Sequence, residues 1–531
     1  MKKSGNYLSK GYGTKVTPQS EKIPGSNQVP NSAGGFAFGI DDWKRLDRFI
    51  LIGSEGGSYY TSERELTKGN AEAVARCINA DGVRVVDRIV EISEAGRAPK
   101  NDPALFALAM CAGIGDEKTR KAALEALPNV ARIGTHLFHF VSYVEQFRGW
   151  GRGLRNAIGE WYDEKSDDDL AFQVVKYQQR DGWSNRDLLR LSHPVPLNDG
   201  HKKIFKWVVD GECPKGVHKL IQGFEKAKVA KTEKALLTLI EKYGLTMEMI
   251  PTQFATSPAV FEALLPNLGL TAVIRNLGNM SKSGYLAKGK WDAVNAVCER
   301  ILDEKNIKKS RVHPIVILNA LVTYKAGHGL LGKGEWEVVP EVTDALDKAF
   351  YLGFPNVEPT DKRIVLALDV SGSMKNNNAS GFQNLSCRLA SAAMAMVTYK
   401  TEKSVAMLAF CDKIVPLDIS RCTTLEGVVK KMSDLPFGRT DCAQPMIWAT
   451  EKRVEADAFI IYTDNETWFG NIHPTQALKQ YRKDFGIPAK LIVAAMTPTE
   501  FSIADPADSG MLDVVGFDSS APQIMSQFIT E

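Results

Sequence analysis

The feature that most constrains the fold is a short apolar run, residues 364–368, followed at once by Asp369-Val370-Ser371-Gly372-Ser373. An aliphatic run of this length predicts a buried parallel strand. The polar residues would then lie at the carboxyl edge of an open α/β sheet, which is where such sheets bind ligands. The sequence therefore predicts a binding site at the end of this strand.

Two later segments supply further oxygen atoms. Thr440 lies in a polar segment after a predicted helix, and a second apolar run, residues 458–463, ends at Asp464. Carboxylate and hydroxyl oxygens are ligands that Mg²⁺ prefers, and Mg²⁺ often keeps several waters. The sequence therefore predicts a divalent metal site, with Mg²⁺ as the expected ion, formed by Asp369, Ser371, Ser373, Thr440 and Asp464.

An alternative is that Asp369 and the two serines only cap the helix predicted to begin near Leu385 and satisfy loop amides. That alternative does not explain Thr440 and Asp464.

From Arg363 onward, strand-like and helix-like segments alternate. This alternation is typical of a parallel, doubly wound α/β sheet. We expect this domain to cover residues 359–531, because the segment 355–359 has the Pro and Asn content of a linker. The predicted strands are 364–369, 405–410, 458–463, 490–495 and 512–516, and the predicted helices are 385–399, 423–434, 474–485 and 521–529.

Residues 31–358 carry apolar side chains at three- and four-residue spacing, separated by Gly, Pro and Asn. Roughly thirty residues per helix pair is typical of an α-solenoid of the HEAT kind, although the repeats share no fixed motif period. An irregular helical bundle is the alternative. The predicted helices include 42–52, 71–78, 103–112, 118–127, 135–147, 231–243, 260–265, 291–302 and 314–323.

Composition narrows the class of protein further. Residues 1–30 hold five lysines and one acid, which predicts a mobile basic tail that either RNA phosphates or only water could contact. The net charge is only +3, so a nucleic-acid partner has to be argued from a local patch. Eight cysteines without C-x-x-C pairs, no apolar secretory segment and no apolar run near the roughly 18 residues of a membrane span predict a cytoplasmic protein.

The stretch between residues 147 and 207 mixes cations with aromatic side chains. Lys176 and Arg180 are four residues apart, so on a helix they would share a face, and Arg186 and Arg190 would do so on the next helix. Such cations neutralise phosphates, and exposed aromatic rings stack on unpaired bases. The alternative is a solvated charged face with the tryptophans in the core.

Several ordered motifs resemble the Ro autoantigen, or TROVE-domain, family, and the resemblance extends over residues 29–531. The five predicted metal ligands, in their order, resemble the metal-ion-dependent adhesion site of von Willebrand factor A domains. In that site a carboxylate of a partner, or water, completes the metal's shell. The family motifs are Asn31–Gly35, Arg45–Arg48, Gly53–Tyr60, Gly134–Phe138, Lys176–His193, Arg275–Asn279 and Thr463–Trp468, the last of which is most similar to bacterial members.

The resemblance implies a ring of HEAT-like helical repeats with a central hole, followed by a von Willebrand factor A domain. It also implies that small noncoding Y RNA binds the outer surface and that single-stranded 3′ ends of misfolded or damaged RNA enter the hole. In bacterial members a Y RNA tethers the protein to the exoribonuclease polynucleotide phosphorylase.

The family's Y RNA contacts carry over to Lys176, Arg180 and His193, whereas Arg186 and Arg190 come from helical spacing alone. No motif assigns residues to the hole. A ring closed within one chain would let the monomer function.

Three functions fit these patterns. The first, which we expect, is an RNA-binding scaffold without catalysis that acts in RNA quality control. The second is a Mg²⁺-dependent module that recruits a protein through an acidic residue of the partner. The third is a nuclease at Asp369 and Asp464, which the small number of carboxylates disfavours. No P-loop sequence indicates an ATPase.

Overall fold

The structure, a computed structural model of the whole chain, describes residues 16–53, 63–310, 312–329, 334–354, 357–379, 382, 384–436, 438–497, 499–515 and 520–531. The chain forms two compact units. The helical unit contains residues 71–353, and the sheet unit contains residues 1–70 together with residues 354–531. Within the described residues, every helix is too short or too polar to cross a bilayer.

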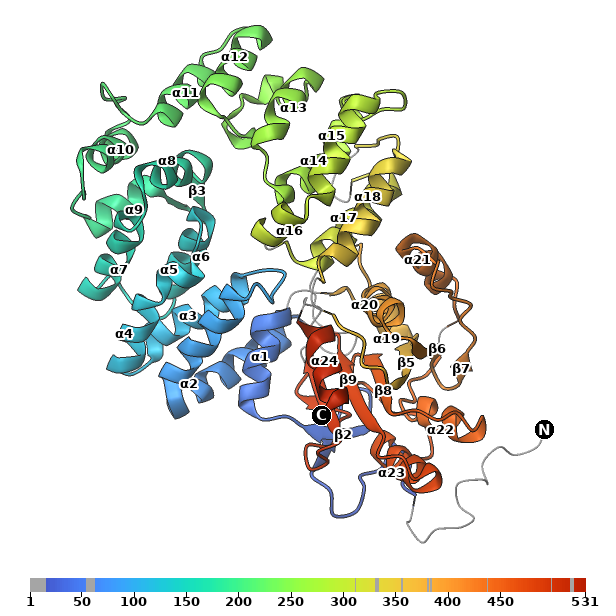
Figure 1. Cartoon of the computed structure of the whole chain (residues 1–531). Helices are drawn as coiled ribbons and strands as arrows, with labels where there is room; N and C mark the ends of the chain where they lie inside the picture. Colours follow the sequence, from blue (N-terminus) through green and yellow to red (C-terminus); the bar gives the residue numbers. More distant parts are fainter. Residues whose placement is uncertain are drawn as a thin grey trace. The chain divides into compact units, whose positions relative to one another are not determined.

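The sheet unit is built on six mostly parallel strands (Figure 1). They are β5 (Arg363–Asp369), β6 (Ser404–Phe410), β7 (Ile414–Val415), β8 (Ala458–Thr463), β9 (Lys490–Ala495) and β11 (Met511–Val515). Their spatial order is β11-β9-β8-β5-β6-β7, and only β7, at one edge, runs antiparallel to its neighbour. The central strands β5 and β8 are buried almost throughout, because both faces of a parallel sheet are covered.

Helices cover this sheet. They are α1 (Asp42–Ile52), α19 (Gly372–Asn376), α20 (Cys387–Thr401), α21 (Leu425–Ser433), α22 (Gln444–Glu451), α23 (Pro474–Phe485) and α24 (Ala521–Thr530). One face of β5, with Val365 and Ala367, packs in a buried cluster with Leu478 and Tyr481 of α23. The doubly wound fold predicted from the sequence is confirmed. The short elements β7 and α22 were not predicted, and residue 516 of the last predicted strand lies outside the described residues.

A second, smaller sheet joins the N-terminal segment to this unit. Its strands are β1 (Gln28–Pro30), β2 (Phe36–Gly39) and β10 (Phe501–Ser502). β2 pairs antiparallel with both of the others. The sheet therefore joins a segment near the start of the chain to one near its end.

The prediction of a mobile tail over residues 1–30 is wrong for residues 16–30. The side chain of Gln19 is fully buried, and its amide nitrogen donates to Asp441 Oδ1 at 2.5 Å and to the Ile472 carbonyl at 2.9 Å. Buried polar groups need such partners, and these partners lie more than 400 positions away, beyond the reach of local sequence patterns. Residues 1–15 lie outside the described residues.

The helix α1 also belongs to the sheet unit, so the helical domain predicted from residue 31 begins too early. Arg48 of α1 is fully buried, and its Nη2 donates to both oxygens of Asp513 at 2.8 and 2.6 Å. Its Nη1 donates to the carbonyls of Thr499 and Phe501 at 2.5 and 2.9 Å. This charge-assisted ion pair fixes α1 beside β11.

We expect Asp513→Asn to destabilise the sheet unit by about 3 kcal/mol, because it leaves the buried Arg48 charge without its carboxylate. Urea unfolding, followed by a probe in the sheet unit, measures the change. The matched control is Asp361→Asn, which removes an exposed ion pair with Lys403 and should cost much less, because solvent screens exposed pairs. Equal effects of the two substitutions would contradict this role for Arg48.

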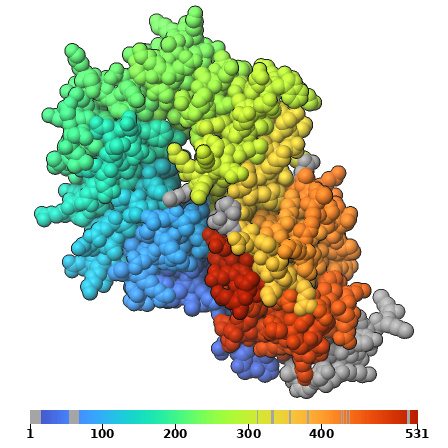
Figure 2. Space-filling view, in the orientation of Figure 1, coloured from blue at the N-terminus to red at the C-terminus, as the bar shows by residue number. Residues whose placement is uncertain are grey.

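The helical unit follows a curve (Figure 1), and the space-filling view shows it as a continuous band from blue through green to yellow (Figure 2). A short hairpin, β3 (Gln179–Arg180) and β4 (Trp183–Ser184), interrupts the helices. The helices are α2 (Glu63–Glu94), which begins in the sheet unit and is irregular at Asp81, α3 (Asp102–Ile114), α4 (Glu117–Glu125), α5 (Leu127–Val130), α6 (Gly134–Val144), α7 (Arg152–Asp163), α8 (Asp167–Lys176), α9 (Asn185–Ser192), α10 (Asp199–Asp210), α11 (Lys219–Lys228), α12 (Glu233–Tyr243), α13 (Pro258–Leu264), α14 (Leu270–Lys282), α15 (Trp291–Leu302), α16 (Glu304–Ser310), α17 (Pro314–Ala326) and α18 (Pro340–Leu352), with 3₁₀ turns at Met247–Met249, Thr252–Phe254 and Leu265–Asn267.

Helices that follow one another in sequence pack together, as α3 does on α4, α11 on α12 and α17 on α18. Many begin at the capping residues that the sequence shows: Ser166, Ser184, Asn198 and Thr232 each accept a backbone N–H of the first turn. The helical architecture predicted for this part of the chain is confirmed. Its HEAT-like classification stays a prediction.

The beginning and the end of the helical unit meet at a buried histidine. His313 donates from Nε2 to the carbonyl of Arg97, 3.1 Å away, in the turn after α2. Its Nδ1 accepts the backbone N–H of Ile315 at 3.2 Å and so caps α17. Burial lowers the pKa of His313 to about 3. The helical unit therefore closes on itself through a neutral imidazole.

We expect this contact to make stability depend on pH. Below about pH 6.5 an unfolded histidine binds a proton that folded His313 excludes until about pH 3, so the folded state loses stability as the pH falls. His313→Asn keeps an N-capping residue and removes the titration. Between about pH 6 and pH 4 the wild type should lose up to about 1.4 kcal/mol more per pH unit than the variant, as measured by urea unfolding. Parallel pH profiles would contradict this.

Candidate functional site

Five oxygen-bearing side chains gather at the carboxyl edge of the large sheet. Asp369 ends β5 and Asp464 follows β8, and these two strands are adjacent. Ser371 and Ser373 follow Asp369, and their Oγ atoms are 3.0 Å apart. Thr440 lies in the loop before α22. All five are at most 3% exposed. The five predicted metal ligands thus lie at one edge of one sheet.

Fixed hydrogen bonds shape the loop after β5. Asp369 Oδ1 accepts the backbone N–H of Ser371 at 2.8 Å, and Asp369 Oδ2 accepts the hydroxyl of Thr463 at 2.7 Å. Arg388 of α20 is buried, and its Nη2 donates to the carbonyls of Val370 and Ser371. The loop backbone is therefore held by a cation that does not touch the carboxylates.

The loop after β8 is held from two sides. The backbone N–H groups of Trp468 and Phe469 both donate to the Thr440 carbonyl, at 3.2 and 3.0 Å, which ties this loop to the Thr440 loop. On the other side Asn31 Nδ2 donates to the Thr467 carbonyl at 2.5 Å. A Cβ at Gly35 would lie 2.2 Å from that carbonyl oxygen, so only glycine fits there.

The edge gathers acidic side chains away from water. Burial raises the pKa of Asp369 and of Asp464, and the Asp464 carboxylate raises that of Asp369 further. Burial and Asp464 also raise the pKa of Glu466 to about 8. Asp464 Oδ2 and Glu466 Oε1 are buried and have no hydrogen-bond partner among the described residues. Uncompensated buried oxygens of this kind are costly, and a bound cation would relieve that cost.

The donors fit a hard cation. Two carboxylates and three hydroxyls supply only oxygen, as Mg²⁺ prefers. Within the described part of the chain, no three His, Cys, Asp or Glu side chains form a group that could hold a metal ion, so the hydroxyls and water would have to complete any shell.

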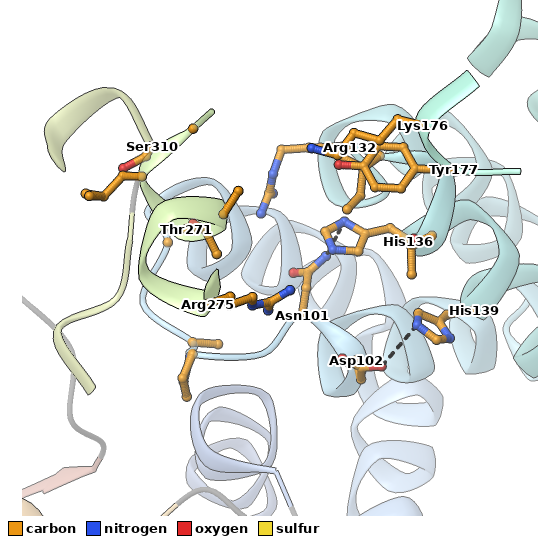
Figure 3. A pocket seen from close by; sticks show the side chains of 18 of the residues that line it. Asn101, Asp102, Arg132, His136, His139, Lys176, Tyr177, Thr271, Arg275 and Ser310 are labelled. Carbon is orange, nitrogen blue, oxygen red and sulfur yellow. Dashed lines mark hydrogen bonds and ion pairs between the residues drawn. The ribbon is translucent and has the colours of Figure 1, made fainter. Parts of the chain in front are cut away.

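A second site lies inside the helical unit. It is a pocket of about 920 Å³ whose walls come from the ends and connections of α2, α3, α5, α6, α8, α14 and α16. Figure 3 shows Thr271 and Arg275 on one wall and Arg132, His136 and Tyr177 across from them. The lining residues that bear charge or a ring are Asp102, Arg132, His136, His139, Lys176, Tyr177, Glu248, Arg275 and Lys309.

The pocket is polar and carries both cations and flat rings. Arg132 and Arg275 point into it (Figure 3). Burial, with the charge of Arg132, lowers the pKa of His136 to about 3, so its ring is neutral at physiological pH. Burial raises the pKa of Tyr177 to about 12, so its ring is also neutral. The pocket can therefore meet phosphates with guanidinium groups and bases with uncharged rings.

The prediction that Lys176 and Arg180 share a helix face is wrong. The helix α8 ends at Lys176, and Arg180 lies in the β3–β4 hairpin that follows. The Lys176 side chain is 19% exposed, lines the pocket and has its Nζ 3.8 Å from Glu248 Oε1. The Arg180 side chain is 62% exposed.

The other predicted RNA-binding residues lie on α9. Arg186 and Arg190 are exposed and share a face of this helix, as predicted, and the helix begins after the capping box of Ser184. His193 is exposed at its C-terminal end with a φ of 49°. None of these side chains lines the pocket. Arg180, Arg186, Arg190 and His193 are called the hairpin surface below.

Comparison with known proteins identifies the family. The TROVE domain model matches residues 29–244 and 240–323, and the Ro60 vWA domain model matches residues 363–529. RNA-binding protein RO60 of Deinococcus radiodurans is 42% identical over 515 residues, which are 96% of this chain and 97% of that protein. This chain belongs to the Ro60 family.

Two further relatives are also similar to nearly the whole chain. RNA-binding protein RO60 of Caenorhabditis elegans is 36% identical to this Ro60-family chain over 597 residues, covering 97% of it and 92% of the relative. The crystal structure of the Deinococcus radiodurans RO (RSR) protein superposes with a TM-score of 0.69 at 40% identity. It covers 92% of this chain and 99% of that chain.

The sequence did not indicate how several residues of this Ro60-family protein would act at its sites. Gln19 supports the carboxyl edge of the sheet but lies far from it in sequence, and Arg388 of α20, 17 positions after Ser371, holds the loop after β5. Arg132 and Arg275 are separated by more than 140 positions, and only the fold shows that they face one pocket. The Asp181-Gly182 pair, a typical two-residue hairpin turn, was a signal that could have ended the predicted helix at Lys176.

Proposed function

We propose that this protein is a non-catalytic RNA-binding scaffold of the cytoplasm. A small structured RNA of the Y RNA class binds the hairpin surface, and the single-stranded 3′ end of a misfolded or damaged RNA occupies the pocket of the helical unit. The observation that carries the proposal is the closed helical unit with a polar pocket into which Arg132 and Arg275 point. Two curated relatives named RNA-binding proteins, similar over nearly the whole chain, support it.

The pocket suits an unpaired chain better than a duplex. Its cations come from separate segments, so phosphates can be met at several points along a bent chain. Tyr177 and the neutral His136 offer rings on which unstacked bases can stack. Asn276 and Thr271, which also line it, can hydrogen-bond base edges or 2′-hydroxyls.

The hairpin surface suits a structured RNA. Its three arginines and one histidine are exposed and lie on two consecutive elements, so they can contact phosphates of one folded RNA. Lys176 lies between this surface and the pocket, because it ends α8 just before the hairpin and lines the pocket. Its loss should therefore affect both classes of RNA.

We expect the two RNA classes to separate by mutation. Arg180→Ala with Arg190→Ala should weaken binding of a stem–loop RNA by about tenfold or more and lower its salt slope by about two, while a single-stranded oligoribonucleotide is unaffected. Arg132→Ala with Arg275→Ala should weaken binding of the single-stranded oligoribonucleotide and leave binding of the stem–loop RNA unaffected. Fluorescence anisotropy at several salt concentrations measures both.

The control for these variants is Lys121→Ala, which removes a cation on α4 that is 75% exposed and is assigned to neither site. It should leave both affinities within about twofold. Loss of both RNA classes in either double variant, at unchanged melting temperature, would contradict separate sites.

We further propose that the carboxyl edge of the sheet binds Mg²⁺ through Asp369, Ser371, Ser373, Thr440 and Asp464. The buried, unpartnered Asp464 Oδ2 favours this. A bound Mg²⁺ would offer an open position to a carboxylate of a protein partner, which suits the recruitment of an exoribonuclease such as polynucleotide phosphorylase. Recruitment of an acidic protein partner through this edge is the second candidate function. The two carboxylates among the proposed ligands are fewer than two-metal hydrolysis uses, so we assign no nuclease activity.

Mg²⁺ should stabilise the sheet unit. At about ten times the dissociation constant, linkage predicts about 1.4 kcal/mol, or a rise of about 3–5 °C in melting temperature. Asp464→Ala should abolish this rise. Asp418→Ala, which removes a fully exposed carboxylate of the same unit, should preserve it. An equal Mg²⁺ response of all three proteins would contradict the site.

A further inference from the structure

The hairpin β3–β4 has a two-residue turn that its sequence specifies. Asp181 and Gly182 have φ angles of 53° and 82°, so both lie in the left-handed region that a type I′ turn requires. Arg180 pairs with Trp183 across this turn. The turn therefore places Asp181 at the tip, directly beside the exposed Arg180.

The Asp181 carboxylate has a partner on each side. His139 of α6 donates from Nδ1 to Asp181 Oδ2, and Arg180 Nε lies 3.8 Å from Asp181 Oδ1. The other nitrogen of His139, Nε2, is 3.7 Å from Asp102 Oδ1, on the pocket wall (Figure 3). Asp102, His139, Asp181 and Arg180 thus form a line of alternating charge that leads from the pocket to the hairpin tip when His139 is protonated.

The base of the hairpin is held independently of its tip. Asn185 donates from Nδ2 to the Tyr177 carbonyl at 2.6 Å, and its Oδ1 accepts the hydroxyl of Tyr162 at 2.9 Å. Trp183 packs against Trp150 with ring centroids 5.6 Å apart. A change at Asp181 should therefore free the tip while the hairpin itself stays folded.

We propose that Asp181 is a positioning residue for RNA binding. By joining Arg180 to His139 it holds the guanidinium on the hairpin surface before RNA arrives. A free arginine loses conformational entropy when it binds a phosphate, and prior positioning lowers that loss. The proposal rests on the function proposed above, because it concerns the same contact of Arg180 with structured RNA.

The direction in which one substitution changes RNA affinity tests the positioning role of Asp181. Asp181→Asn removes the carboxylate charge and leaves Asn-Gly, the most favoured pair for the same turn. If Asp181 acted only as a negative charge near RNA, its removal would tighten binding. Positioning predicts the opposite: a stem–loop RNA should bind about three- to tenfold more weakly. Fluorescence anisotropy with a labelled stem–loop RNA measures the change, with the melting temperature as a check on folding.

Two further variants make the test specific. His139→Gln should weaken stem–loop RNA binding by a factor similar to that for Asp181→Asn, because it removes the other end of the contact. In an Arg180→Ala background, Asp181→Asn should cause no further weakening, because the residue that it positions is gone. A purely structural role of Asp181 would instead weaken binding equally with and without Arg180.

Unchanged or tighter binding by Asp181→Asn, where Arg180→Ala weakens binding, overturns the positioning role and leaves the hairpin surface intact. If Arg180→Ala itself has no effect, the hairpin surface and the positioning role both fail. The two failures are therefore distinguishable in one set of proteins.

Discussion

The functional geometry of the helical unit depends on its closure at His313. The pocket walls come from segments as far apart in sequence as Ser93 and Ser310, and the hydrogen bond of His313 to Arg97 joins the same two parts of the chain. A buried imidazole makes that contact and caps α17 with its second nitrogen, which is possible only while the ring is neutral. Protonation of this ring would remove the cap on α17, because Nδ1 could no longer accept.

The sheet unit also buries ionisable side chains. Its carboxyl edge buries Asp369, Asp464 and Glu466 together, and the cost is offset by backbone N–H groups, by hydroxyls and by supports that come from elsewhere in the chain. The N-terminal segment is one of these supports, through Asn31 and Gln19. A metal ion at this edge would complete a site whose oxygen donors are already held in place.

Local patterns were enough to predict the elements but not their long-range partners. The β-branched and aliphatic run before Asp369 acts through neighbouring residues, so the strand β5 was predicted correctly. Gln19 and Arg48 acquire their roles from residues more than 400 positions away, and no local pattern carries that information. The predicted shared face of Lys176 and Arg180 was wrong because helical spacing was extended past the end of α8 into a hairpin.

The central claim is that the pocket holds a single-stranded RNA end, and photocrosslinking tests it most directly. A single-stranded oligoribonucleotide with a 4-thiouridine at its 3′ end would be crosslinked to the full-length protein, and the modified peptides identified by mass spectrometry. We expect adducts at Tyr177, His136 and residues 271–276, which line the pocket. Adducts confined to the hairpin surface or to the sheet unit would contradict the claim.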